Sequence, residues 1–459
     1  MRTNHLFGSL GSFGFIVYVV FSGVAAEPEP ALTDAALQKI LQERIDAKKA
    51  VGLVVGRLQG TNRSIVTAGT MALGSGQPVD GDTVFEIGSI TKIFTGILLG
   101  DMANRGELQA NDPVTNYLPA TVKVPNRNGH VITLAHLANH HSGLPREPDN
   151  LAPADKKNPY ADYTPELLFR FLSTYELPRD PGSTYEYSNV GMGLLGDVLA
   201  RRASTSYEQL VLDLICKPLG MGDTRIKLSA EMQNRFATGY DYDLNPAKNM
   251  DFLSLAGGGA FRSTANDFLK FLAISLDPQD DRLSKAIRAS QAARTNTVGL
   301  NEEVAWGWHF KCVPDEILHH SGKTFGFHSF MGINRKRHRA VVVFSNCQFS
   351  IDDIGLHVLD PRSELIPAQK PIVLDEITLG RYVGTYTVTP TLEITVTREK
   401  NEMYIQATDQ PKHDIFALAR DQFFCETGPL RLTFKTNVSG MVTEVILRQA
   451  GQEYRAHRK

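Results

Sequence analysis

The sequence predicts an α+β protein: a large domain, built from an antiparallel sheet flanked by helices plus an all-helical region, followed by a small antiparallel β domain. Three observations support this prediction. Strand patterns near both ends of residues 27–362 enclose a mostly helical middle. Residues 363–372 contain Pro367 and Pro371 and are typical of a linker. Short alternating strands separated by turn residues fill residues 373–459 and indicate an antiparallel barrel or sandwich.

Residues 1–26 have the pattern of a secretory signal peptide. Arg2 precedes an uncharged, mostly apolar run, and small residues precede the acidic stretch that begins at Glu27. This pattern predicts cleavage after Ala26. The run at 6–26 is also just long enough to span a bilayer, so an uncleaved anchor is the alternative. We expect an exported protein, periplasmic or secreted, without stable membrane insertion once the signal is removed.

The composition of the 459-residue chain excludes one class of partner. Its net charge of −2 gives no basic field that would attract nucleic acid. The cysteines, Cys216, Cys312, Cys347 and Cys425, are far apart and form no CxxC motif. We therefore expect buried thiols, although an exported chain could instead pair Cys312 with Cys347.

The large domain begins with a helix and two strands. Helical periodicity at 32–49 is followed by strand patterns at 51–58 and 64–71. A second helix begins near Ser89 and is closed by Gly106.

The middle of this domain, about residues 130–290, is mostly helical with long polar loops. Strand patterns return at 305–310, 316–320, 326–334 and 339–346. The two ends of the domain are thus expected to supply the sheet, and the middle to supply helices.

Ser89 and Lys92 form the first motif with chemical meaning, an SxxK sequence that occurs once in the chain. Side chains three residues apart on a helix share a face, so the lysine amine can reach the serine hydroxyl. An apolar run at 84–87 leads into this helix, which places Ser89 at its positively polarised start. The pair alone is weak evidence, because chance gives roughly one such spacing in a chain of this length.

Tyr187 and Asn189, in a YxN sequence before an apolar helical segment, form the second candidate. A tyrosine near a lysine ammonium can have its proton affinity lowered and become a proton shuttle. The asparagine offers a donor and an acceptor to an amide substrate. The alternative is a loop tyrosine beside an asparagine turn.

The third candidate is His320, Ser321 and Gly322, at the end of a strand and followed by Lys323. The same HHSG letters occur at 140–143. That first copy ends a helical segment, where its glycine fits a helix C-cap, so it is interpreted as structural. The second copy lies on a strand edge, where backbone NH groups can point at a substrate.

The order SxxK, YxN, HxG resembles that of the penicillin-recognising serine hydrolases, and most closely the class C β-lactamase family with its D-alanyl-D-alanine carboxypeptidase and esterase relatives. The resemblance covers residues 32–357. It extends to surrounding stretches at 107–119, 134–145, 219–224 and 257–267. The C-terminal segment is similar to the small β domain appended to some members. The resemblance implies a β-lactamase/transpeptidase-like fold and hydrolysis of β-lactams or D-alanyl peptides.

The resemblance also assigns roles. Ser89 is the acylated nucleophile, Lys92 its proton acceptor and Tyr187 a proton shuttle, with Tyr187 as the base if Lys92 stays charged. Asn189 holds the substrate amide. The backbone NH groups of Ser89 and Lys323 form the oxyanion hole.

One residue departs from the pattern, because class C β-lactamases carry lysine where this chain has His320. That lysine attracts the substrate carboxylate, and a histidine is charged only fractionally at pH 7. A carboxylesterase with the same machinery is therefore an alternative function, and a non-catalytic penicillin-binding or scaffold protein is another. No cofactor is predicted, and His136 and His140 lack the acidic partner of a zinc motif, so no metal site is predicted either. Gly257 to Gly259 lack the ending of a phosphate loop and are expected to precede a helix capped by Ser263 or Thr264.

Overall fold

A computed structural model describes residues 31–297, 302–312, 314–368, 371–389, 392–408, 412–425, 430–449 and 452–459. The predicted signal peptide, residues 1–26, lies outside the described residues. The chain divides into two compact units, one comprising Thr33–Thr297 and Asn301–Gly355 and the other containing Leu356–Lys459. We describe each unit by itself.

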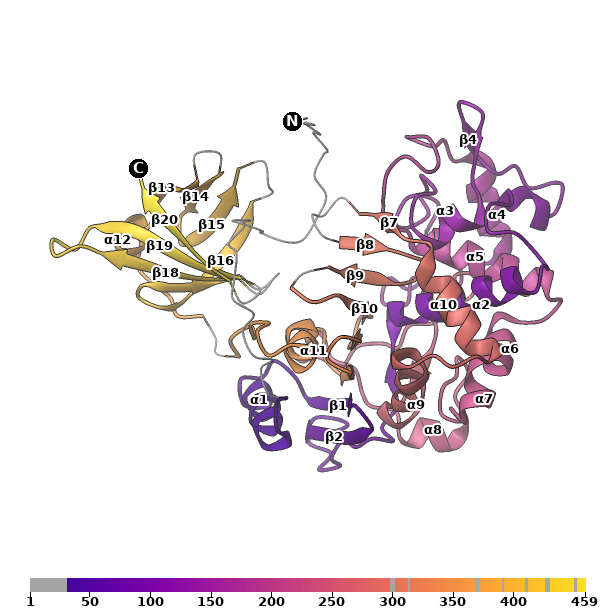
Figure 1. The fold of residues 1–459 in the computed structure, drawn as a ribbon, viewed down its shortest axis with the longest axis horizontal. Coiled ribbons are helices and arrows are strands. Elements are labelled where there is room, and N and C mark those ends of the chain that lie inside the picture. The colour runs from indigo at the N-terminus through magenta and orange to yellow at the C-terminus, as the bar shows by residue number, and fades with distance from the viewer. Residues whose placement is uncertain are drawn as a thin grey trace. The chain divides into compact units, whose positions relative to one another are not determined.

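The larger unit is built on an eight-stranded sheet with the order β2-β1-β12-β11-β10-β9-β8-β7, in which every neighbouring pair is antiparallel (Figure 1). The strands are β1 (Gly52–Gln59), β2 (Asn62–Gly69), β7 (Thr295–Asn296), β8 (Glu302–Val304), β9 (His309–Lys311), β10 (Ile317–Lys323), β11 (His328–Asn334) and β12 (Arg339–Ser345). Because β1 pairs with β12, the two ends of the domain meet in the sheet, which confirms the predicted arrangement.

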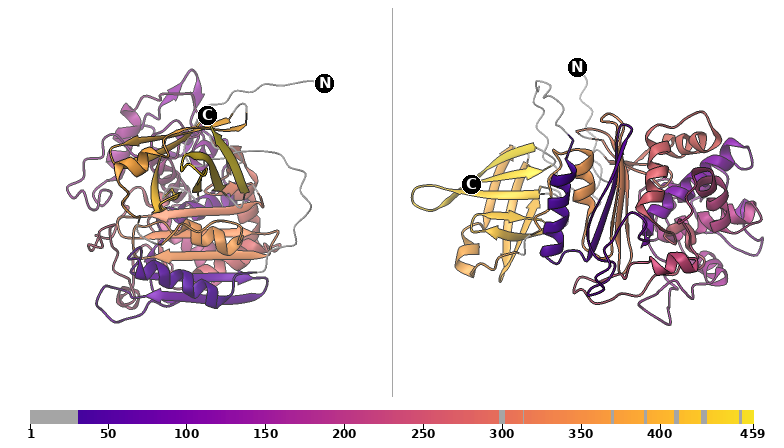
Figure 2. Two further views of the ribbon diagram at one scale, coloured as in Figure 1. Left: turned by 90° about the vertical axis from the view of Figure 1, so that its left-hand side faces the viewer. Right: turned by 90° about the horizontal axis from the view of Figure 1, so that it is seen from below.

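Helices cover both faces of the sheet. Figure 2 shows α1 (Asp34–Asp46) on one side and the helical region on the other. The helical region contains α2 (Thr91–Asn104), α3 (Leu134–Ala138), α4 (Pro165–Thr174), α5 (Asn189–Arg202), α6 (Tyr207–Val211), α7 (Lys217–Leu219), α8 (Ala230–Asn234), α9 (Ala265–Leu276) and α10 (Arg282–Ala292). Helix α11 (Asp352–Leu359) follows the last strand. Its Asp353 forms a buried ion pair with Arg44 of α1.

Helix α2 lies in the centre of this unit and is buried at every position from Thr91 to Met102. Two glycines allow the chain to pack against it: a Cβ at Gly96 would lie 1.9 Å from the Trp306 carbonyl oxygen, and one at Gly307 would lie 2.2 Å from the Lys92 carbonyl oxygen. Gly307 has φ +75°, which turns the chain between β8 and β9. The prediction of one continuous strand at 305–310 is therefore wrong.

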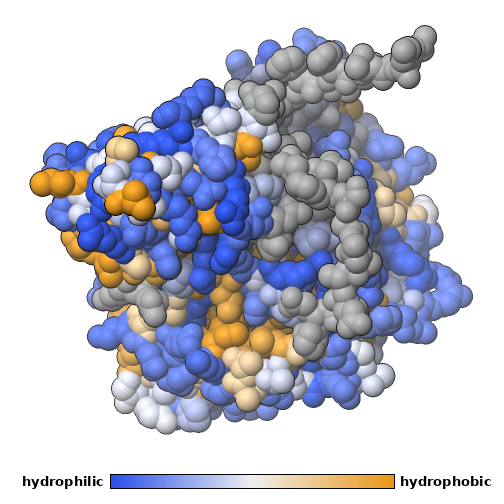
Figure 3. Space-filling model, turned by 60° about the vertical axis from the view of Figure 1, so that its left-hand side comes forward, coloured by the Kyte–Doolittle hydropathy of each residue, from blue (hydrophilic) through white to orange (hydrophobic). Residues whose placement is uncertain are grey.

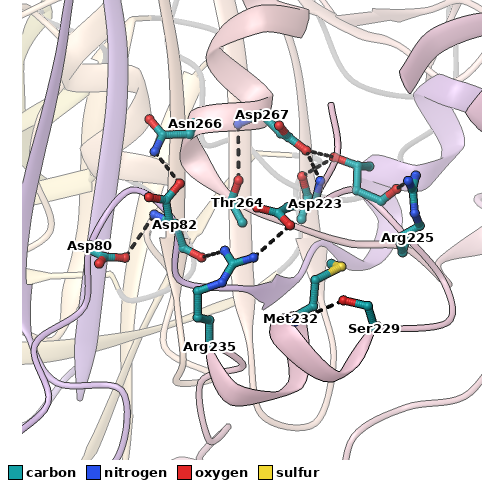
Figure 4. Close-up of polar contacts among 12 residues, drawn as sticks. Asp80, Asp82, Asp223, Arg225, Ser229, Met232, Arg235, Thr264, Asn266 and Asp267 are labelled. Atoms are coloured by element: carbon teal, nitrogen blue, oxygen red, sulfur yellow. Dashed lines mark hydrogen bonds and ion pairs between the residues drawn. The ribbon is translucent and has the colours of Figure 1, made fainter. Parts of the chain in front are cut away.

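A polar cluster fixes the start of α9 (Figure 4). The Thr264 side chain accepts a hydrogen bond from the Asp267 backbone and caps the helix, as predicted. The Asp267 carboxylate accepts bonds from the Asp223 backbone at 2.8 Å and the Thr224 hydroxyl at 2.9 Å. Arg235 closes the cluster by donating to Asp223. These contacts fix the first turn of α9.

The smaller unit contains a closed antiparallel barrel, preceded by α12 (Glu376–Gly380). Its strands are β13 (Gly384–Thr389), β14 (Leu392–Glu399), β15 (Glu402–Ala407), β16 (His413–Ala419), β17 (Gln422–Phe424), β18 (Leu430–Thr436), β19 (Val442–Gln449) and β20 (Gln452–Arg458). The rings of Tyr382, Tyr386, Phe423 and Phe434 pack together in its core. Of the two predicted architectures, the barrel is confirmed. In Figure 3, hydrophobic areas are scattered over a largely hydrophilic face.

The cysteines form no disulfide: all four are free thiols, and three are buried. Buried thiols are therefore confirmed for Cys216, Cys347 and Cys425, whereas Cys312 is half-buried, and the alternative pairing of Cys312 with Cys347 is wrong. Within the described ranges, no helix has both the length and the hydropathy needed to cross a bilayer.

Candidate active site

Ser89 lies in a 3-10 turn, Gly88–Ile90, that joins the short strand β3 (Phe85–Glu86) to α2. The Lys92 side chain is fully buried one helical turn later, and its Nζ lies 2.9 Å from the Ser89 hydroxyl oxygen. Strand β3 pairs with β6 (Arg262–Ser263), which holds the entry to α2 in place. The predicted contact between the amine and the hydroxyl is thus present.

Two further oxygens surround the Lys92 amine. Nζ lies 2.8 Å from Asn189 Oδ1 and 2.5 Å from the Gly258 carbonyl oxygen. Burial lowers the pKa of Lys92 well below its usual value, and the charge of Arg146 acts in the same direction, while Glu147 opposes them. The site therefore favours a neutral amine.

Tyr187 lies just before α5 and packs on Lys92 and on His140. Lys92 Nζ is 4.9 Å from the centroid of its ring, and the His140 ring stacks on it at 4.5 Å. Burial raises the pKa of Tyr187 to about 12, although hydrogen bonding to Ser89 acts in the opposite direction. The prediction that the lysine lowers the proton affinity of this phenol is therefore wrong, because the desolvation of the buried phenol outweighs the neighbouring groups that favour its ionised form.

Asn189 is the first residue of α5, which is capped by the Ser188 side chain. Its Oδ1 faces Lys92, and its Nδ2 donates to Glu147 Oε1 at 2.6 Å. The predicted YxN motif thus contributes both of its polar side chains to the surroundings of Lys92.

Strand β10 brings the third motif beside Ser89. A Cβ at Gly322 would lie 2.0 Å from the Ile87 carbonyl oxygen, and a Cβ at Gly88 would lie 2.9 Å from the Lys323 backbone nitrogen. Only glycines allow the strand edge and the Ser89 turn to approach so closely. The two predicted oxyanion donors, the backbone NH groups of Ser89 and Lys323, therefore come from adjoining segments.

The side chains of the third motif divide between the two faces of β10. His320 is buried on the Ser89 side, where its ring lies 6.3 Å from that of Tyr187. Ser321 belongs to the opposite face and donates to Asp352 Oδ2 at 2.7 Å, so its hydroxyl takes no part in the site. Lys323 is exposed, and its amine donates to the Tyr242 hydroxyl at 2.5 Å.

His320 is held as a neutral imidazole. Burial, with the neighbouring His309 and Lys92, lowers its pKa well below the usual value. Its Nδ1 lies 2.7 Å from the Ser321 carbonyl oxygen, an acceptor, so Nδ1 carries the proton and donates. Nε2 is consequently an acceptor, buried and without a hydrogen-bond partner among the described residues. This position supplies no positive charge.

The prediction of a helix that ends at Gly143 is wrong. Helix α3 ends at Ala138, and His140 adopts φ +63°, so its side chain lies against Tyr187. Its Nδ1 accepts a hydrogen bond from the Ser188 backbone at 3.1 Å. The same segment carries Arg146, whose guanidinium lies 5.0 Å from the Tyr187 ring centroid, and Glu147. The sequence signals for this segment are the repeated HHSG letters and the family-like stretch at 134–145.

Among the described residues, no three His, Cys, Asp or Glu side chains lie together in a group that could hold a metal ion. The histidines around Tyr187 are instead packed ring against ring, His309 on His320 at 4.8 Å.

Comparison with known families agrees with this geometry. A family model described as Beta-lactamase matches residues 37–357, more than half of the chain. The chain belongs to the beta-lactamase family. The resemblance identified from the three motifs is thereby confirmed, and so is the predicted fold.

Curated members of the family include peptidases and penicillin-binding proteins. The chain is 29% identical over 371 residues to the D-alanyl-D-alanine-carboxypeptidase/endopeptidase AmpH of Escherichia coli K12, which covers 75% of this chain and 94% of that protein. It is 26% identical over 413 residues to penicillin-binding protein 4* of Bacillus subtilis, which covers 82% of this chain and 88% of that protein.

Solved structures of the family superpose on the chain. A class C beta-lactamase from Rhodobacter sphaeroides is 27% identical, with a TM-score of 0.60 over 70% of this chain and 95% of that one. A beta-lactamase/D-alanine carboxypeptidase from Yersinia pestis has a TM-score of 0.61 at 24% identity, over 71% of this chain and 98% of that one, which supports the shared fold. A second family model, Domain of unknown function (DUF3471), matches residues 368–458.

Proposed function

We propose that the protein is an exported serine hydrolase of the class C β-lactamase type, which forms an acyl-enzyme at Ser89 on β-lactams or D-alanyl peptide amides. The observation that carries the proposal is the buried Lys92 amine, 2.9 Å from the Ser89 hydroxyl, with a lowered pKa. Residues 27–362 would form the hydrolase domain, residues 363–372 a linker and residues 373–459 an accessory β domain.

The partners of Lys92 explain how it can act as a base. A neutral amine has two N–H donors and one lone pair. The carbonyl oxygens of Asn189 and Gly258 can only accept, so they take both donors. The lone pair is thereby left for the hydroxyl proton of Ser89, and the hydroxyl oxygen can attack a carbonyl carbon as that proton moves to Nζ.

The remaining steps use Tyr187 and the strand edge. The NH groups of Ser89 and Lys323 donate hydrogen bonds to the developing oxyanion, and each such donor typically contributes about 2.7 to 4 kcal/mol. As the C–N bond breaks, the neutral phenol of Tyr187 gives its proton to the leaving amine and regains one from the Lys92 ammonium. In deacylation a water attacks the ester, its proton returns through Tyr187 and Lys92, and Ser89 recovers its hydroxyl.

The substrate choice follows from relatives and from His320. Names of the matched relatives include carboxypeptidase, endopeptidase and beta-lactamase activities, which supports an amide substrate. The neutral, acceptor-only Nε2 of His320 gives no charge to a terminal carboxylate. A carboxylesterase is the second candidate. The alkoxide that leaves an ester depends less on protonation than the amine that leaves an amide.

Intact-mass spectrometry tests the proposal. Wild type incubated with benzylpenicillin should gain one penicilloyl group, and Ser89→Ala should gain none. Rates on nitrocefin, a D-alanyl-D-alanine peptide and a short p-nitrophenyl ester then separate the candidates: turnover of the ester alone would replace the amide hydrolase by an esterase. A stable adduct without turnover of any substrate would indicate a non-catalytic penicillin-binding protein.

A further inference from the structure

The segment that carries Glu147 is joined to the start of α5 through its backbone. The Arg146 carbonyl oxygen accepts a hydrogen bond from the Asn189 backbone NH at 2.9 Å. The Pro145 carbonyl oxygen accepts one from the Ser188 hydroxyl at 2.7 Å. These bonds do not involve the Glu147 side chain, so a substitution at this position changes the side chain and leaves the two segments joined.

The Asn189 amide is held at both of its ends. Its Oδ1 accepts from the Lys92 amine at 2.8 Å, and its Nδ2 donates to Glu147 Oε1 at 2.6 Å. An ionised carboxylate only accepts, whereas the two ends of an asparagine amide have opposite roles. Glu147 therefore pairs with the nitrogen end, which leaves the oxygen end for Lys92.

The Tyr160 hydroxyl reinforces this arrangement, because it is a hydrogen-bond partner of both Glu147 and Asn189. Burial and the Glu147 carboxylate raise the pKa of Tyr160, so the phenol keeps its proton and donates it to the carboxylate. Hydrogen bonding to Asn189 acts in the opposite direction, as expected when the phenol oxygen accepts from the amide nitrogen. The nitrogen end of the amide thus faces two acceptors.

The orientation of this amide determines what the Lys92 lone pair can do. With Oδ1 toward the neutral amine, Asn189 takes an N–H of Lys92, and the lone pair is left for the hydroxyl proton of Ser89. In the flipped orientation Nδ2 would face the amine, which could accept that donor only with its lone pair. Ser89 would then lose its proton acceptor. The flip is unfavourable while Glu147 is present, because Oδ1 would face the carboxylate and two acceptors would oppose each other.

We propose that Glu147 is a positioning residue for the catalytic base: it fixes the Asn189 amide with its oxygen toward Lys92, and the Tyr160 hydroxyl supports it. The inference rests on the proposed function, in which the neutral amine takes the hydroxyl proton of Ser89. The effect of Glu147 on the reaction passes through Asn189.

The competing explanation is that the charge of Glu147 acts on Lys92 directly. Burial and Arg146 lower the pKa of the amine, and the charge of Glu147 opposes them. Removing that charge would lower the pKa further and move the acidic limb of the acylation rate to lower pH, without changing the plateau on which Lys92 is fully neutral. The plateau therefore reports the orientation of the amide, and the limb reports the charge.

Two substitutions change the hydrogen-bonding role of this side chain stepwise. The carboxylate only accepts, the amide of Glu147→Gln accepts and donates, and the ammonium of Glu147→Lys only donates. The first substitution permits both orientations of Asn189, and the second favours the flipped one. On the plateau, the second-order rate constant for acylation of Ser89 by benzylpenicillin, measured by intact mass, should fall about threefold or more in Glu147→Gln and about tenfold or more in Glu147→Lys.

The same substitutions in an Asn189→Ala background test whether the effect passes through the amide. With no amide to orient, each substitution at Glu147 should change the rate constant by less than about twofold. Glu176→Gln and Glu176→Lys, at an exposed glutamate, are the matched controls and should leave the constant as in wild type. The thermal unfolding midpoint verifies that each variant is folded, and Glu147→Gln, the nearly isosteric change, decides the outcome if Glu147→Lys does not fold.

An unchanged plateau, or a shift of the acidic limb alone, would overturn the proposal. An equal fall with and without the Asn189 amide would also overturn it. Failure of the proposed function looks different, because benzylpenicillin then leaves wild type unlabelled or labels Ser89→Ala as well.

Discussion

Replacing Gly322 by alanine should disable the site by moving strand β10 away from Ser89. The added Cβ would lie 2.0 Å from the Ile87 carbonyl oxygen, about 1.4 Å closer than ordinary van der Waals contact allows. Because the obstacle is backbone, one of the two segments has to move. A displacement of about 1 Å between reacting groups can cost about 100-fold in rate.

The displaced strand carries the Lys323 NH group, so the expected loss is that of one oxyanion donor. Such a loss lowers kcat by about 100- to 1000-fold, or about 2.7 to 4 kcal/mol. The acylation rate with a fluorescent penicillin measures it, and the thermal unfolding midpoint verifies that the variant is folded. Gly222→Ala is the matched control, because nothing lies within 4 Å of the added Cβ there.

A folded Gly322→Ala protein with an acylation rate within threefold of wild type would refute the reasoning. The strand edge would then tolerate a side chain without loss of transition-state stabilisation, and the oxyanion donors would have to be sought elsewhere.

Three further predictions follow from the same geometry. The pKa of Lys92 is lowered, so the acylation rate should fall on the acidic side as Lys92 gains a proton. The pKa of Tyr187 is raised to about 12, so the rate should not decrease on the alkaline side below about pH 10. Lys92→Arg should abolish acylation at all pH values, and retained labelling of that variant would exclude Lys92 as the base. His320→Lys should raise kcat/KM for a D-alanyl-D-alanine peptide relative to its C-terminal amide by about tenfold, because a cation would face the carboxylate; an unchanged ratio would show that another group reads this end of the substrate. The pKa of His319 is lowered to about 4 in the folded state, so below pH 6.5 the unfolded chain binds a proton that the folded protein does not. The unfolding temperature should therefore decrease from pH 6.5 toward pH 4, and it should decrease less in His319→Gln. An unfolding temperature that does not change with pH would contradict this prediction.

The sequence could place the candidate reacting groups together, but not all the groups that surround them. Ser89 and Lys92 could be placed together because a helix fixes the distance between positions three apart. Tyr187 and the strand edge required a family resemblance, since contacts between distant segments leave no local periodicity. The same limit applies to Ser321, a candidate in the third motif whose side chain is turned to Asp352 by the alternation of β10.

His140 was missed for a different reason. The letters around it fit a helix ending at Gly143, but the helix ends at Ala138, and His140 takes a left-handed conformation that sends its ring to Tyr187. A positive φ at a non-glycine residue is uncommon and is imposed by the surrounding structure. The interruption of the strand at Gly307 has a similar cause, because the chain turns there where it packs closely against the backbone of α2.

The burial of α2 links catalysis to the integrity of the whole larger unit. Ser89 and Lys92 flank the first turn of a helix with no solvent-facing position from Thr91 to Met102, so no small local opening can release them. Loss of penicillin labelling during denaturant titration should therefore coincide with cooperative melting of the domain. The amide protons of α2 should exchange with deuterium among the slowest in the chain, which makes this enzyme's activity a direct reporter of its global folding equilibrium.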